Sequence, residues 1–250
     1  MYIKIMYIKV HSKFILTPLL EILRDGVNAC HSLNNGIEVY PMGEYYLQSL
    51  FLKMTGAQEQ KMKCICWEIA TNDYEYRYKY LNGKHGEYSS YSEKKEVYSL
   101  LIKEIKNIQT SFCPIKAFDS SIERLTSVII YNIENLLNET QFIYFAQRDY
   151  NIFANKISEL FREENLTLND KTFFGTRLQD LYQEIIWKHR NRCAHNLLSY
   201  QQDLPNLEIL ADPEHTYSNY FFRYAILILI DEIFMKLYEK YIDVMGAFEI

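Results

Sequence analysis

The fold is decided near the end of the chain, in the run Tyr224-Ala225-Ile226-Leu227-Ile228-Leu229-Ile230. This run lies inside a helical pattern that extends from about Tyr217 to Val244. A helix that is apolar nearly all round is covered by protein on every side, unlike a surface helix with one apolar stripe. The run is also far shorter than the ~20 apolar residues that span a bilayer. We therefore predict a helix at the centre of a helical bundle.

Five earlier segments repeat apolar residues at three- and four-residue spacing, which is typical of amphipathic helices. In the fifth, Leu178, Ile185 and Cys193 follow one face, whereas Asp180 and Glu184 lie off it. The sequence thus predicts an all-α fold. The expected helices are residues 44–81 with a candidate kink at Gly56, 93–108, 120–138 with Asp119 or Ser120 as its cap, 141–163 and 178–193, separated by a turn at 82–86 and a loop at 196–214.

The first part of the chain is less regular. It has a short strand-like start, an apolar helical turn around Leu19 to Leu23, and then Asn34-Asn35-Gly36 and Pro41, which favour turns. We divide the chain into an N-terminal extension, residues 1–43, and a helical domain, residues 44–250. With 250 residues, both a single elaborated domain and a domain with an appendage are open.

The composition limits the classes of function. A formal net charge of -5 does not attract nucleic acid over long range, so any contact with RNA has to be local. The five cysteines have neither the number nor the spacing of a disulfide framework or a four-ligand zinc site, and they favour a reducing compartment. Lys4 and Lys9 interrupt what would be the apolar stretch of a signal peptide. We expect a cytoplasmic protein with no membrane association.

One short segment is strongly basic, Trp187-Lys188-His189-Arg190-Asn191-Arg192-Cys193-Ala194-His195-Asn196. No acidic residue occurs between Glu184 and Asp203, so the segment forms a local attractor for phosphate in an acidic protein. The alternative is a solvated helix end, where cations interact favourably with the carbonyl pole. The chain contains no Gly-rich phosphate loop, Gly-x-Ser-x-Gly elbow or His-Glu-x-x-His pair that would point to other chemistry.

Within this segment Arg190, Asn191 and His195 have the spacing of a known signature. The segment resembles the Arg-Asn-x-x-x-His motif of HEPN domains (higher eukaryotes and prokaryotes nucleotide-binding). The context agrees, because the motif lies at the end of a long amphipathic helix and another long helix follows it. The resemblance covers residues 44–245, although only the motif matches residue by residue.

The resemblance implies a bundle that forms a homodimer through the motif-bearing helix and brings two motifs together in a cleft. Many HEPN proteins cleave RNA without a metal or another cofactor, and many stand-alone bacterial members are toxins or anti-phage defence effectors. By this resemblance His195 is the general acid or base, Arg190 stabilises the phosphate, and Asn191 orients the histidine or contacts substrate. Lys188 and Arg192 are secondary RNA-binding candidates.

The spacing raises a geometric difficulty. On an ideal helix Arg190 and His195 point about 140° apart. Three arrangements would bring them together: the helix unwinds at Ala194, the long arginine wraps around, or one subunit's Arg190 serves the other subunit's His195. Arg192, three residues from His195, is the nearer cation along the sequence.

Other interpretations stay open. The chain can be a non-catalytic HEPN module that binds RNA, a nucleotide or a defence partner protein. It can also be the HEPN half of a toxin–antitoxin pair, although such proteins carry a modified tyrosine where this chain has Leu197. A purely structural helical protein is the remaining alternative, against which the isolated basic segment argues.

Several further side chains invite interpretation. His189 and Cys193 share a helix face that is apolar, so we expect core packing and no metal site. The tyrosines at positions 74, 76, 78 and 80 alternate, which on a helix divides them between core and surface and gives little support to base stacking. Four glutamates could hold Arg190, although surface ion pairs are the default expectation. They are Glu59, Glu68, Glu75 and Glu123.

Overall fold

The computed structural model describes residues 11–30, 40–83, 86–118, 122–138, 147–195 and 216–246. Throughout these ranges the regular structure is helical and no strand occurs, which confirms the predicted all-α bundle. None of the helices in the described ranges has the length and apolar character that a bilayer span requires. The expected strand-like start, the caps Asp119 and Ser120, and the loop at 196–214 lie outside the described residues.

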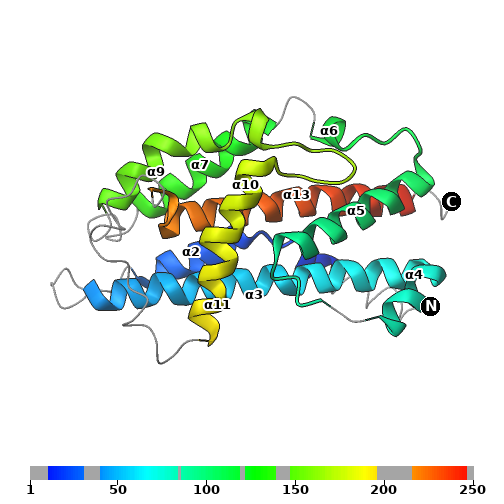
Figure 1. The fold of residues 1–250 in the computed structure, drawn as a ribbon, viewed down its shortest axis with the longest axis horizontal. Coiled ribbons are helices and arrows are strands. Elements are labelled where there is room, and N and C mark those ends of the chain that lie inside the picture. Colours follow the sequence, from blue (N-terminus) through cyan, green and yellow to red (C-terminus); the bar gives the residue numbers. More distant parts are fainter. Residues whose placement is uncertain are drawn as a thin grey trace.

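The last helix, α13 (Tyr220–Gly246), lies at the centre of the bundle (Figure 1). Every residue from Tyr220 to Asp231 is buried. Helices α2 (Leu19–Cys30), α3 (Tyr40–Asn72), α5 (Tyr91–Ile108), α7 (Ile122–Asn138) and α9 (Gln147–Leu160) all contact it. The prediction of a central helix is confirmed, because α13 offers apolar side chains in every direction and is covered on every side.

The long helix expected over residues 44–81 is two helices. α3 ends at Asn72, and α4 (Tyr74–Asn82) begins directly after Asp73. The Asp73 carboxylate accepts a hydrogen bond from the Tyr76 backbone N–H at 3.0 Å and so caps α4. The Arg77 side chain donates to the Ala70 carbonyl at 2.6 Å and ties the two helices together. The break in the expected helix therefore lies at Asp73, and α3 continues through Gly56.

The connection into α5 is fixed by its own cap. Ser90 and Glu93 form a capping box, in which each side chain binds the backbone N–H of the other residue. The short helix α6 (Pro114–Ala117) then leads to α7 and α9, whose bounds lie within the expected segments 120–138 and 141–163. Residues 139–146 lie outside the described ranges.

The motif-bearing rod consists of three consecutive segments: α10 (Thr176–Leu181), the π-helix η3 (Tyr182–Trp187) and α11 (Lys188–His195). The π segment is shown by the Lys188 N–H, which donates to the Gln183 carbonyl five residues earlier. In Figure 1 the rod crosses the bundle in front of α13 and reaches α3. Contacts between α11 and α3 place the basic segment against the middle of the bundle.

The described part of the N-terminal extension packs into the common core. Ile15, Leu19 and Val27 are each 1% exposed. The Leu19 N–H donates to Asp231 at 2.7 Å, and Asp231 also pairs with Lys61 at 2.6 Å, so a buried ion pair binds the start of α2 to α3 and α13. The expected boundary between residues 43 and 44 falls inside α3, which begins at Tyr40.

Candidate functional site

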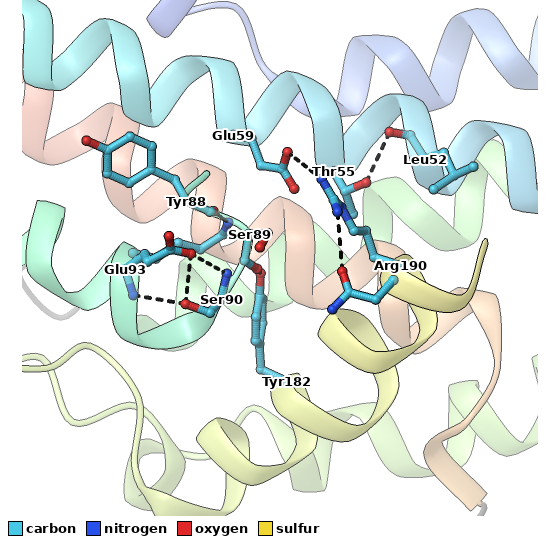
Figure 2. A network of polar contacts seen from close by, with 11 residues as sticks. Leu52, Thr55, Glu59, Tyr88, Ser89, Ser90, Glu93, Tyr182 and Arg190 are labelled. Atoms are coloured by element: carbon cyan, nitrogen blue, oxygen red, sulfur yellow. Dashed lines mark hydrogen bonds and ion pairs between the residues drawn. The ribbon is translucent and has the colours of Figure 1, made fainter. Parts of the chain in front are cut away.

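Arg190 is held in place from two sides. Its Nη2 atom lies 3.1 Å from Oε2 of Glu59 on α3, and its Nη1 atom donates to the Asn191 side-chain oxygen at 3.2 Å (Figure 2). The Arg190 and Glu59 side chains are 17% and 12% exposed, so the pair is largely shielded from water but reaches the surface. A fixed guanidinium at the surface can present its remaining N–H donors to a phosphate in one orientation.

Glu59 is thus the glutamate that binds Arg190 among the four candidates. Glu68 pairs instead with His11 at 2.7 Å, and Glu75 lies in the first turn of α4. The side chain of Glu123 lies outside the described residues. The expectation of surface ion pairs is wrong for Glu59 and Glu68, which are 9% and 5% exposed, because both project from α3 into packed surroundings.

The three arginine and lysine side chains of the basic segment do not form one patch. On α11, Arg190 points about 160° away from both Lys188 and Arg192, since each lies two residues from it. Lys188, Asn191 and Arg192 line a groove of about 1050 Å³ on the outer face of the rod. Lys188 pairs there with Glu184 at 2.5 Å. Asn191 connects the two sides, because it lines the groove and also binds Arg190.

The side chain of His195 lies outside the described residues, so its meeting with Arg190 stays a prediction. The backbone nevertheless tests one of the three arrangements that would bring Arg190 and His195 together. Helix α11 is regular through Ala194 and ends at His195. The first of the three arrangements, in which the helix unwinds at Ala194, is therefore wrong. Two of the three arrangements remain: the long Arg190 side chain wraps around the helix, or the Arg190 of one subunit serves the His195 of the other.

His189 is half-buried, and its imidazole is neutral at pH 7. Its ring lies 5.2 Å from the Phe51 ring, and its Nε2 atom lies 3.2 Å from the Tyr220 hydroxyl. Burial, together with the charges of Arg223 and Arg192, lowers the pKa of His189 to about 3. The Cys193 sulfur lies 3.5 Å from the same Nε2 atom. No group of three possible metal ligands occurs among the residues that the structure describes.

The tyrosines of α4 divide as the alternation predicts. Tyr76 and Tyr80 pack against the core with ring centroids 5.7 Å apart, whereas Tyr74 and Tyr78 are 76% and 66% exposed. Their rings point in different directions because residues two apart lie about 160° from one another around a helix.

The structure adds a charged residue that the sequence interpretation missed. Lys94 is only 1% exposed, and its ammonium donates to the Tyr88 carbonyl. Next to it, the buried Tyr182 hydroxyl donates to the Ser89 carbonyl at 2.8 Å (Figure 2). The signal was present in the sequence, since Lys94 lies three and four residues before Val97 and Tyr98 and so begins the apolar stripe of α5.

Comparison with known proteins gives no relative for this chain: no family model matches it, and neither a curated protein nor a solved structure is similar to it.

Proposed function

We propose that the protein is a metal-independent endoribonuclease of the HEPN type, acting as a toxin or an anti-phage defence effector. The observation that carries the proposal is the arrangement of Arg190, which is fixed by Glu59 on α3 and by Asn191, a residue that also lines the groove. Such an arginine can stabilise charge on a phosphate without a metal ion, because its donors are oriented before substrate arrives.

The proposed reaction is attack by a ribose 2′-oxygen on the adjacent phosphorus. The O2′–P bond forms and the P–O5′ bond breaks, while one group accepts the 2′-hydroxyl proton and another donates a proton to the leaving 5′-oxygen. Arg190 would stabilise the negative charge of the phosphorane, and His195 would accept or donate a proton. Asn191 would keep Arg190 in place. Two proton-transfer groups are needed, and a second subunit can supply the second one.

A homodimer through the motif-bearing rod is part of the proposal, and charge complementarity supports it. Four exposed charges on the groove face follow one another at four-residue spacing, with two acidic residues before two basic ones. They are Asp180, Glu184, Lys188 and Arg192. In an antiparallel pair centred near residue 186, Glu184 would face the partner's Lys188 and Asp180 would face the partner's Arg192. A two-fold axis makes every such contact twice.

This register also brings the two α11 segments side by side, with each Arg190 on the α3 side of its own rod. Arg190 lies four residues from the centre, so the two copies would be eight residues, or about 12 Å, apart along the helix axes. Asn191 and Arg192 of both subunits would line the same cleft. RNA bound there would meet cations from two chains, which compensates locally for the net charge of the protein.

The test is cleavage of single-stranded RNA in the presence of a chelator. Wild-type protein should produce fragments with 2′,3′-cyclic phosphate and 5′-hydroxyl ends, and Arg190→Ala and His195→Ala should lower the rate at least 100-fold. Arg162→Ala, an exposed arginine next to a different helix, is the matched control and should retain full activity. Tight RNA binding without cleavage would instead favour a non-catalytic HEPN module. A folded wild-type protein that neither binds nor cuts RNA contradicts the proposal.

A further inference from the structure

A buried lysine lies behind the ion pair of Arg190 and Glu59. Lys94 belongs to the first turn of α5, and its ammonium lies 5.7 Å from the centre of the Tyr182 ring. Among the charged groups around it, Glu59 on α3 acts on Lys94 most strongly, followed by Glu93 on its own helix and Arg190 on α11. Glu59 therefore forms a direct ion pair with Arg190 and acts on the charge of Lys94 through space.

This sharing matters when Arg190 has to bind something else. To stabilise a phosphate, the guanidinium has to turn some of its donors away from Glu59. Glu59 is only 9% exposed, and a largely buried carboxylate that loses its cation is destabilised because water replaces the partner only in part. With no second cation nearby, Glu59 would hold Arg190 back from the substrate.

We propose that Lys94 is a positioning residue, which balances the charge of Glu59 while the Arg190 guanidinium turns to the phosphate of bound RNA. The inference rests on the proposed ribonuclease function. Lys94 does not touch the substrate, since its side chain is enclosed by the Tyr88 carbonyl and the Tyr182 ring. Its effect reaches the reaction through Glu59 and Arg190.

The protonation of Lys94 makes the role measurable. Burial lowers the pKa of Lys94 to about 8, against the opposing effects of Glu59 and Glu93, so the ammonium form prevails at pH 7 and is lost in mildly alkaline solution. A phosphate at Arg190 brings another negative charge toward the cluster and should raise this pKa. Cleavage should accordingly fall above about pH 8, while Arg190 stays charged at these pH values.

The experiment compares Lys94→Met, Lys94→Arg and the matched control Lys103→Met, an exposed lysine of the same helix. Rates of RNA cleavage are measured between pH 6 and 9.5, with the folded fraction checked by circular dichroism. Lys94→Met should lower kcat at least tenfold at pH 7 with little change in KM, and this deficit relative to wild type should shrink above pH 8, where wild type loses the same charge. Lys94→Arg should lose less activity than wild type between pH 8 and 9.5, because arginine does not lose its proton there. An unchanged kcat and pH profile in folded Lys94→Met overturns the inference.

A second measurement uses the wild-type protein and covers the case in which the variants do not fold. The Lys94 Nζ signal is titrated by NMR with and without inorganic phosphate. A higher pKa of Lys94 in the presence of phosphate supports the inference, and an unchanged pKa with phosphate bound overturns it. Failure of the ribonuclease function has a different signature, since it is the wild-type protein that then leaves RNA uncut.

Discussion

The coupling between Glu59 and Arg190 offers the sharpest test of the site. Removing one partner of a fully buried ion pair costs roughly 3–5 kcal/mol, because the remaining charge is left without a partner. Here the two side chains retain 17% and 12% exposure, so water compensates for part of this cost. We expect Glu59→Gln to lower the free energy of unfolding by about 2 kcal/mol, and the melting temperature by about 4–8 °C for a chain of this size.

A double-mutant cycle separates the coupling energy between Glu59 and Arg190 from a general disruption of the fold by either substitution. Glu59→Gln, Arg190→Gln and the double variant are unfolded in urea at pH 7, and the loss in the double variant should be about 2 kcal/mol smaller than the sum of the single losses. The control cycle uses Glu184 and Lys188, which also pair but are 60% and 51% exposed and should couple by less than about 0.5 kcal/mol. Additive losses at Glu59 and Arg190 would refute the reasoning.

Two further predictions concern the dimer and the half-buried histidine. Asp180→Arg and Arg192→Asp chains should each self-associate roughly 10- to 30-fold more weakly than wild type, because two exposed attractions become repulsions. An equimolar mixture should recover the affinity in sedimentation measurements, and a mixture as weak as its components contradicts the antiparallel register. For His189, the unfolded chain takes up a proton near pH 6.5 and the folded chain only near pH 3, so stability falls as the pH drops through this interval. His189→Leu should show a smaller difference in urea midpoint between pH 7 and pH 4.5 than wild type, and an equal difference would show that His189 does not titrate in this way.

The general architecture could be predicted because it depends on periodic burial. A helix that is apolar all round has to be buried by other helices, and the apolar run of α13 is buried in this way. The break at Asp73 could also have been predicted, since an aspartate is a strong helix cap and Asp73 binds the N–H three residues later. The sequence interpretation continued the helix to residue 81 and named only Gly56 as a candidate kink, and α3 continues through that glycine.

The site was predictable only in part. Four glutamates on the predicted helices were candidates to bind Arg190, and only the three-dimensional packing selects Glu59. The point at which α11 crosses α3 is set by contacts between segments that are distant in the sequence. Lys94 was missed for a related reason. A lysine is expected at the surface, and its burial here depends on the nearby Tyr88 carbonyl and on the Tyr182 ring, which comes from a distant part of the chain.

The π segment sets which way each side of the basic segment faces. A π turn holds one residue more than an α turn, and an extra residue rotates everything after it by about 100° relative to what precedes it. Leu178 before the segment and Tyr182 at its start face the core, and the Tyr182 hydroxyl donates to the Ser89 carbonyl. After it, Arg190 faces Glu59 while Arg192 faces the groove. A regular helix through the same anchor at Tyr182 would aim Arg190 elsewhere, so the local irregularity is what lets one rod pack its apolar face and still deliver the guanidinium to α3.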